Sequence, residues 1–184
     1  MAAVTDPDDR LRVPRAVEPD SALVLRARRG DAAAFETIFD RHSGWVTALA
    51  MRFLGQRDDA LDVLSETFEY LVGKMPSLTL TTTLRGFLYP VVRHLSISKH
   101  RQRKRRANVD DVVLIDASWL DAWIQPDLRK ALAAVEPPHR EVVLMRFGDG
   151  LSVREIAEAL AIPEGTVKSR LHHAIRALRE VLGS

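Results

Sequence analysis

The stretch GLSVREIAEALAIPEGTVKSRLHHAIRAL, residues 150–178, decides the fold of the C-terminal part of this chain. Ser152, followed three residues later by Glu155, forms a capping box and predicts the start of a helix. Pro163 cannot continue that helix but suits the first turn of a second one. An apolar stripe at helical spacing marks the second helix: Val167, Leu171, Ile175 and Leu178. Two short helices around a tight turn predict a helix-turn-helix, whose second helix enters the major groove of DNA.

Cationic and hydrogen-bonding side chains lie off this apolar stripe, where they could meet DNA. The alternative is a helical hairpin with a basic solvated face, but the register of cap, turn and basic helix favours DNA. Adjacent histidines diverge by about 100° around a helix, so a metal site at this pair is not expected. The candidate DNA-facing residues are Lys168, Ser169, Arg170, His172, His173 and Arg176.

The composition of the chain excludes several classes of protein. The 184 residues are 46% hydrophobic and contain no cysteine, which excludes a disulfide framework, a thiolate nucleophile and a cysteine-based zinc site. No apolar run approaches the roughly 18 residues of a membrane span, so we expect a cytoplasmic protein without membrane insertion. Phosphate-cradling glycine loops and nucleophile elbows are missing, so we expect neither an enzyme nor a cofactor.

The part of the chain before residue 107 shows helical periodicity only. A short helix capped by Asp20 and Ser21 is expected to end at Gly30. The next is capped by Asp31 and ended by Gly55, a third runs from Asp58 or Asp59 to Pro76, and a fourth runs from Leu84 into a basic cluster. Pro90 interrupts the fourth stripe, and we favour one kinked helix over two separate ones.

A sharp change of charge divides the chain. Residues 99–106 are nearly all cationic, whereas residues 107–127 contain several aspartates and neither Lys nor Arg. We therefore predict an all-α protein with two small helical domains joined by a linker, the C-terminal one a helix-turn-helix. The segments are a disordered tail (1–20), a helical domain (21–106), an acidic linker (107–126) and the helix-turn-helix domain (127–184). Trp119 and Trp123 lie in the linker, and we expect it to dock, on its own domains rather than on a partner.

The order of these features resembles the bacterial sigma factors, and the compact two-domain form resembles their extracytoplasmic-function (ECF) group. The resemblance rests on DALDVLSETF (59–68), LRGFLY (84–89), RHL (93–95), the basic run, the acidic linker and the helix-turn-helix. It covers about residues 20–182. It implies a dissociable initiation subunit that binds core RNA polymerase and promoter DNA.

The resemblance also implies a polymerase-binding face on the third helix. In the family, the corresponding helix binds a coiled coil of the polymerase clamp. The matching residues are Asp59, Asp62, Ser65 and Glu66. The family usually has Glu at the place of Leu61 and Gln at the place of Ser65, so this contact is expected to be weakened or retuned.

The fourth helix resembles the part that reads and opens the downstream, minus-ten element. Opening needs a basic track for phosphates and a pocket for an extruded base, which the loop 76–83 would form. The implied residues are Arg85, Arg93, His94, Ser98, Lys99, Arg101, Arg103, Lys104, Arg105 and Arg106. The family often has Trp, Asn and Asp at the places of Phe87, His94 and Ser98. For Phe87 and Tyr89 we favour core packing over base contact.

The helix-turn-helix resembles the part that reads the upstream, minus thirty-five element. Lys168, Ser169, His172 and His173 stand where base edges are read, since Lys reaches guanine acceptors and imidazole donates or accepts. The residues expected to hold phosphates are Thr166, Arg170 and Arg176, with Arg154 as a weaker candidate. The family commonly has Arg at the place of His173, which predicts a different sequence preference.

Three functions remain open at this point. The favoured one is an alternative sigma factor. The others are a polymerase-independent helix-turn-helix regulator and a degenerate sigma-like adaptor that binds polymerase without melting DNA. The resemblance also suggests an anti-sigma factor, inserted between the two domains, as a further partner.

Overall fold

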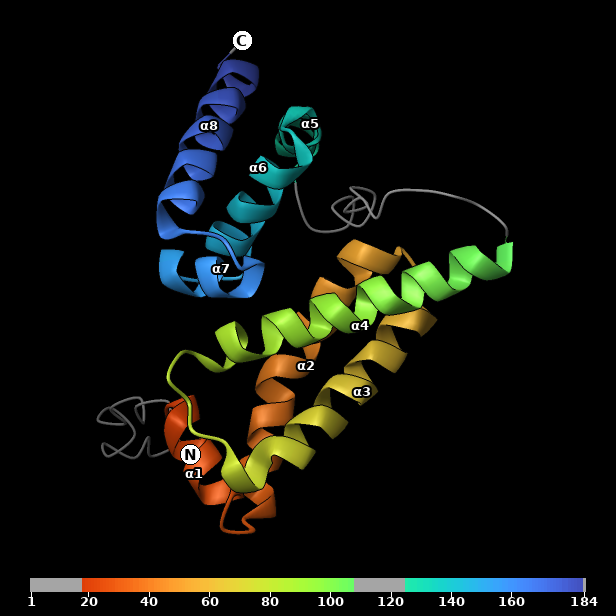
Figure 1. Ribbon diagram of the computed structural model, residues 1–184, viewed down its shortest axis with the longest axis vertical. Coiled ribbons are helices and arrows are strands. Elements are labelled where there is room, and N and C mark those ends of the chain that lie inside the picture. Colours follow the sequence, from red (N-terminus) through yellow and green to blue (C-terminus); the bar gives the residue numbers. More distant parts are fainter. Residues whose placement is uncertain (1–17, 108–124, 184) are drawn as a thin grey trace, which may run out of the picture.

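The computed structural model describes residues 18–107 and 125–183, and within these ranges all regular structure is helical (Figure 1). The first four helices are α1 (Asp20–Ala27), α2 (Ala32–Leu54), α3 (Arg57–Lys74) and α4 (Leu84–Ala107), with a 3₁₀ turn η2 (Met75–Ser77) after α3. The others are α5 (Pro126–Ala134), α6 (Pro137–Val143), a π-helical turn η4 (Leu144–Gly148), α7 (Val153–Leu160) and α8 (Glu164–Leu182). The all-helical fold class is therefore confirmed.

Helix α2 is the centre of the N-terminal domain (residues 18–107), and α1, α3 and α4 all pack against it. The side chain of Asp31 caps α2 by accepting a hydrogen bond from the Ala34 amide at 3.1 Å, as predicted. Gly55 ends the helix with a φ of 66°, a left-handed conformation that glycine adopts without steric cost. The buried faces of α2, α3 and α4 form the core through Ile38, Val46, Leu49, Leu71 and Leu88.

Two helix starts differ from the sequence prediction. Asp20 does not cap α1, because Pro19 occupies the cap position and Asp20 is already helical. The carboxylate of Asp20 instead binds Arg41 and His42 on α2, so a tertiary ion pair uses the group that we expected to serve the backbone. Helix α3 begins at Arg57, just before the predicted aspartates, which then lie in its first turn and favour the positive end of the helix dipole.

Helix α4 runs without interruption from Leu84 to Ala107 and contains Pro90 in its interior. The preference for one helix over two is thus confirmed. Pro90 lies on the exposed side, whereas Leu84, Leu88 and Val92 on the opposite side are fully buried. Burial of that apolar face offsets the backbone hydrogen bond that the proline removes.

In the C-terminal domain (residues 125–183), helices α5, α6 and α7 pack against α8. The capping box is present, since the Ser152 amide donates to Glu155 at 2.7 Å and the Glu155 amide donates to Ser152 at 3.2 Å. Pro163 occupies the cap position of α8 rather than its first turn. Ala161 turns the chain between the helices with a φ of 52°, which is uncommon for a residue other than glycine.

The two domains share one apolar core. Met145, Leu151 and Ile156 of the C-terminal domain belong to the same buried cluster as Leu84 and Leu88 of α4. Figure 1 shows α7 lying across the first half of α4, and the two helices are in contact. A second, smaller cluster lies within the C-terminal domain, around Leu132, Leu144 and Ala174. Two domains were predicted, but their direct packing was not.

Two sequence expectations concern chain segments that the structure does not describe. Docking of Trp119 and Trp123 in the linker falls outside residues 18–107 and 125–183. Disorder was predicted for residues 1–20; residues 1–17 also fall outside these ranges, whereas Glu18 and Asp20 form ion pairs and Asp20 begins α1, so the prediction is wrong there. Among the described helices, none combines the length and apolarity that crossing a bilayer requires.

Candidate functional site

The predicted DNA-reading face of α8 is accessible. Lys168, Ser169, His172, His173 and Arg176 are exposed, while Thr166 and Arg170 are half-buried. On the opposite side of the helix, Val167 and Ala174 are fully buried. This division follows from the helical repeat. Residues three or four positions apart lie on the same side of a helix, and the residues between them lie on other sides. The sequence therefore located this surface without knowledge of the tertiary structure.

Neighbouring side chains contact two of the predicted cations and one of the histidines, and only the histidine is contacted from another helix. The ring of His173 stacks on the ring of His139 from α6, with centroids 5.5 Å apart and planes at 20°. Arg176 lies 3.5 Å from the Nδ1 atom of His173. Arg154 on α7 forms an ion pair with Glu158 at 2.9 Å, one turn along the same helix. His139 was not singled out from the sequence, since its approach to α8 depends on how α6 packs.

The predicted polymerase face and the predicted basic track adjoin each other. Lys99 Nζ lies 2.6 Å from Asp62 and 4.0 Å from Glu66, and Arg103 lies 3.3 Å from Asp59. These ion pairs join α4 to α3, which pack side by side (Figure 1). Ser65 donates its hydroxyl to the Leu61 carbonyl of its own helix at 3.2 Å. Asp62, Ser65 and Glu66 remain exposed, so a partner can still reach this acidic face.

The threonine loop before α4 opens onto a groove of about 800 Å³ between α3, α4 and α7. Thr81 and Thr82 of the loop line this groove, as do Phe87 and His94 of α4. Phe87 is half-buried and stacks on Tyr70, with ring centroids 6.3 Å apart. Tyr89 is a core residue as predicted: burial raises the pKa of its hydroxyl well above its usual range.

Two residues predicted for the downstream element contact the C-terminal domain instead of standing apart from it. Arg85 donates to the Asp149 carbonyl at 3.2 Å and lies over the Trp45 ring, 5.5 Å from its centroid. Arg93 forms an ion pair with Glu141 on α6 at 2.9 Å. Arg101, Arg103 and Arg105 of the basic run are exposed and lie farther along α4.

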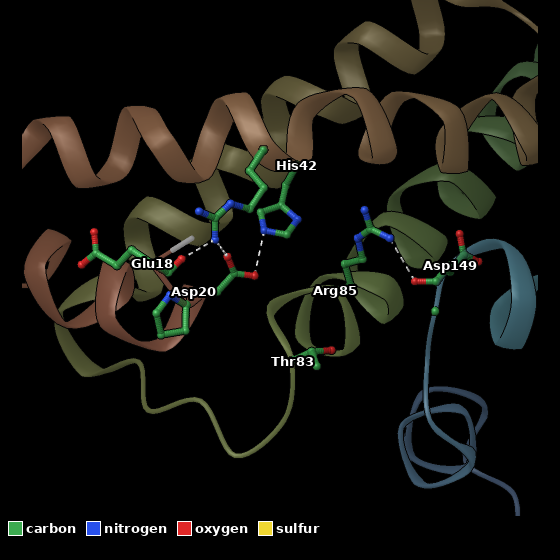
Figure 2. Close-up of a pocket in the computed structure, with 9 residues that line it drawn as sticks. Glu18, Asp20, His42, Thr83, Arg85 and Asp149 are labelled. Atoms are coloured by element: carbon green, nitrogen blue, oxygen red, sulfur yellow. Dashed lines mark hydrogen bonds and ion pairs between the residues drawn. The ribbon is translucent and has the colours of Figure 1, made fainter. Parts of the chain in front are cut away.

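Figure 2 shows a pocket of about 420 Å³, lined on one side by Arg85 and the backbone of Asp149 and on the other by Asp20 and His42. Arg41 donates to Asp20 at 2.5 Å, and His42 Nε2 lies 2.9 Å from the other carboxylate oxygen. Burial lowers the pKa of His42, against the opposing effect of Asp20. The sequence placed His42 on the apolar face of its helix, which is where it lies.

Asp149 and Glu155 form contacts between the two domains, although little in the sequence singles them out. Asp149 stands between two glycines, which is typical of a turn, and its side chain is fully buried against Arg52 and Trp45 of α2. Glu155 was predicted only as a capping residue. One available signal was Arg52, a charged residue within the otherwise apolar end of α2.

Glu155 uses its two carboxylate oxygens differently. One oxygen caps α7 by accepting from the Ser152 amide. The other accepts from the Thr82 hydroxyl at 2.6 Å, from the Thr83 amide at 2.9 Å and from the Thr83 hydroxyl. Burial by itself would raise the pKa of Glu155, but the hydrogen bonds outweigh it and lower this pKa to about 2. The carboxylate is therefore charged at any physiological pH.

Comparison with known proteins agrees with this division of the chain. Residues 38–106 match the family described as Sigma-70 region 2, and residues 126–178 match Sigma-70, region 4. The ECF RNA polymerase sigma factor SigL of Mycobacterium tuberculosis is 32% identical over 173 residues, which cover 88% of this chain and 96% of SigL. SigW of Bacillus subtilis is 26% identical, with 86% of this chain and 94% of SigW covered.

Solved structures agree at the level of the fold. CnrH, in complex with the cytosolic domain of CnrY, superposes with a TM-score of 0.63 at 22% identity, over 90% of this chain and 98% of CnrH. The sigma factor RpoE of Bartonella quintana, in complex with the anti-sigma factor NepR, superposes with a TM-score of 0.60 at 23% identity, over 81% of this chain and 96% of RpoE.

Proposed function

The chain belongs to the ECF sigma factors, which direct promoter recognition by RNA polymerase, and we propose how its surfaces divide that work. The acidic face of α3, made by Asp59, Asp62, Ser65 and Glu66, binds core polymerase. The basic end of α4 follows the phosphates of the downstream element, and the exposed face of α8 reads the upstream element as duplex DNA. The protein is thus an initiation factor, not an enzyme, and works in the cytoplasm, where the polymerase is.

The observation that best supports this division is the shared edge of the acidic and basic surfaces. Lys99 and Arg103 lie at ion-pairing distance from Asp62 and Asp59, so the two surfaces lie on packed helices. A polymerase element bound on α3 would then lie next to DNA bound along α4. Such an arrangement would hold promoter DNA beside the bound polymerase.

Transcription in vitro tests the proposal most directly. Purified core RNA polymerase and genomic fragments are incubated with and without the protein, and the transcripts are mapped. New discrete start sites only in its presence support the proposal and define the promoters. Binding to core polymerase without new transcripts would instead support the sigma-like adaptor, since Phe87, His94 and Ser98 depart from the family pattern.

Glu66→Lys is expected to weaken binding to core polymerase by at least tenfold while leaving the fold intact. Glu66 is half-exposed, and its carboxylate lies 4.0 Å from Lys99. A lysine here puts a second cation near Lys99 and reverses the charge that a basic partner would meet. Affinity for labelled core enzyme measures the effect. Glu36→Lys, the same change at an exposed site on α2, is the control and should bind as the wild type does. Equal affinity of both variants would remove Glu66 from the interface.

His173→Ala is expected to change the preference for bases in the upstream element by about 1–3 kcal/mol at one position. His173 is exposed on α8 and held against His139, so its ring is already ordered before DNA binds. Competition among promoters that differ at single base pairs measures the change. A uniform loss over all sequences would indicate a phosphate contact instead.

An anti-sigma factor is a further proposed partner. RpoE, which shares the fold of this chain, is held by one in its solved complex. Such a partner would have to compete with the contacts that already join the two domains here. Co-purification from the native host tests this proposal. If no small partner is recovered under any growth condition, the proposal is wrong.

A further inference from the structure

The ring of His173, on the exposed face of α8, stacks on the ring of His139 from α6. The two centroids lie 5.5 Å apart and the ring planes are inclined by only 20°. His172 approaches the same ring differently, with centroids 5.8 Å apart and planes at 79°. The stack covers one face of His173, while the residue as a whole stays exposed to solvent. A second helix therefore holds a side chain of the surface that we propose reads DNA.

The position of His139 is set by the packing of α6 on α8. His139 and Val143 are four residues apart, so they lie on the same side of α6. Val143 is buried in the cluster that contains Ala174, the residue of α8 that follows His173. The start of α6 is also fixed, because the Arg140 guanidinium donates to two backbone carbonyls at the end of α5, both at 2.9 Å. His139 therefore extends from a helix start that packing and hydrogen bonds hold in place.

The contact with Arg176 distinguishes the two ring nitrogens of His173. Arg176 Nη2 lies 3.5 Å from Nδ1 of His173, about one turn away along α8. A guanidinium has donors only, so Nδ1 accepts in this contact. A neutral imidazole carries a single proton on nitrogen, which must then be on Nε2. Because Nε2 is the ring nitrogen farther from the backbone, the end of the side chain that can reach a base is a hydrogen-bond donor.

We propose that His139 is a positioning residue for base recognition: it orders the ring of His173, and Arg176 directs the proton of that ring to Nε2, so that His173 reads a hydrogen-bond acceptor in the major groove. This proposal rests on the proposed function, since it concerns the surface of α8 that is assigned there to the upstream element. It adds to that function a residue outside α8 and the chemistry of the base that is read.

A donor at this position distinguishes among the four bases. In the major groove guanine presents two acceptors, O6 and N7, adenine presents N7 and thymine presents O4. Cytosine presents only the donor N4 on that edge. His173 should therefore favour guanine and reject cytosine at the base that it contacts.

The stack on His139 makes this selection stronger than a freely rotating side chain could. An exposed side chain loses rotamer freedom when it binds DNA, and that loss opposes binding. In His173 part of this freedom is already removed, because its ring rests on a residue that α6 fixes. More of the hydrogen-bond free energy is then left to distinguish one base from another.

Nuclear magnetic resonance on the full chain tests the positioning without DNA or polymerase. The ¹⁵N shifts of the His173 ring report which nitrogen carries the proton, and three-bond couplings report averaging of its χ1 rotamer. In mildly alkaline solution the wild type should have the proton on Nε2 and one dominant rotamer. Arg176→Met, which keeps a long side chain but has no donor, should raise the fraction with the proton on Nδ1. His139→Ala should increase rotamer averaging, whereas His139→Phe, which keeps a ring, should not.

Competition binding of the holoenzyme then tests base selection. The probes are promoters mapped by transcription in vitro and changed at single base pairs of the upstream element. At the position where His173→Ala alters the preference, the wild type should favour guanine over cytosine on the order of tenfold. His139→Ala should lower this ratio about threefold, the size expected when one ordered side chain becomes mobile, and His139→Phe should preserve it. Circular dichroism and the amides of the buried core report whether each variant is folded.

A double variant shows whether His139 acts through His173. In the His173→Ala background, His139→Ala should cause no further change in base preference, because the ring that it positions is gone. A second, additive loss in the double variant would overturn the positioning role. So would a His139→Phe variant that behaves as His139→Ala does, because a ring at this position would then not be what matters.

The remaining outcomes separate this proposal from the proposed function. A wild-type His173 proton on Nδ1, or a preference for cytosine at the position that His173 affects, would overturn the reading of an acceptor even if the protein directs transcription. Failure of every variant and of the wild type to bind polymerase and promoter would overturn the proposed function, and the reading of a base with it. The ordering of His173 by His139 would then stand on the magnetic resonance result alone.

Discussion

Replacing Arg52 by methionine is expected to destabilise the protein, in which the two domains pack together, by about 3–5 kcal/mol. The change leaves the carboxylate of Asp149 fully buried with the Trp45 indole as its remaining side-chain donor. The loss of stability has an upper limit, because the two domains can separate and water can then solvate the Asp149 carboxylate. We therefore expect unfolding to change from one cooperative transition to two. Differential scanning calorimetry and urea denaturation measure both effects.

Two further variants test whether the loss of stability comes from the buried pair of Arg52 and Asp149. Arg29→Met removes an exposed arginine from the turn between α1 and α2, and it should change the free energy of unfolding by less than about 0.5 kcal/mol. The double variant Arg52→Met with Asp149→Leu replaces both charges by apolar groups and should recover part of the loss. Additive losses in the double variant would contradict a direct pair, because coupled residues are not additive.

Removal of two exposed cations at the end of α4 is expected to have the largest effect on activity. Arg101→Ala combined with Arg105→Ala should reduce formation of the open promoter complex on the order of 100-fold at physiological salt, about 1.4 kcal/mol for each lost contact. The slope of log affinity against log salt should fall by about two, since each phosphate contact releases counterions. Binding of the holoenzyme to a promoter at several salt concentrations measures both quantities.

The expected loss of DNA binding depends on where the two arginines lie as well as on their charge. A control variant separates these two factors. Arg29→Ala removes a cation from the other end of the domain and should leave the salt slope unchanged. Binding to core polymerase should survive the double change at Arg101 and Arg105, because the acidic face lies on α3. An unchanged salt slope in the double variant would place these arginines away from the phosphates.

Most of the secondary structure could be predicted from the sequence because its signals are local. Asp31 and Gly55 bound α2 as expected, and Ser152 with Glu155 starts α7. The apolar stripe of α8 identifies its exposed face, since the helical repeat fixes which positions share a side. The prediction failed at Asp20, whose carboxylate serves α2 instead of capping α1, because a distant partner competes with the local one.

For the candidate sites, local sequence patterns indicated which residues to consider but not the contacts that these residues make. Charge runs and family motifs indicated the acidic face of α3, the basic end of α4 and the exposed face of α8 as candidate sites. Neither could show that Lys99 and Arg103 lie against Asp62 and Asp59, because ion pairs between helices depend on how those helices pack. Nor could they show that His139 supports His173 from a separate helix.

By itself, the sequence determined the helices, the all-α class, the division into two domains and the family, because periodicity, caps and motifs depend on residues close together in the chain. Only the tertiary structure decided that the domains pack together and that Asp149 pairs with Arg52 across them. It alone showed that Glu155, besides capping its own helix, binds the Thr83 amide of the other domain. These contacts join residues far apart in the sequence, and their free energy depends on burial and distance, which no local pattern encodes.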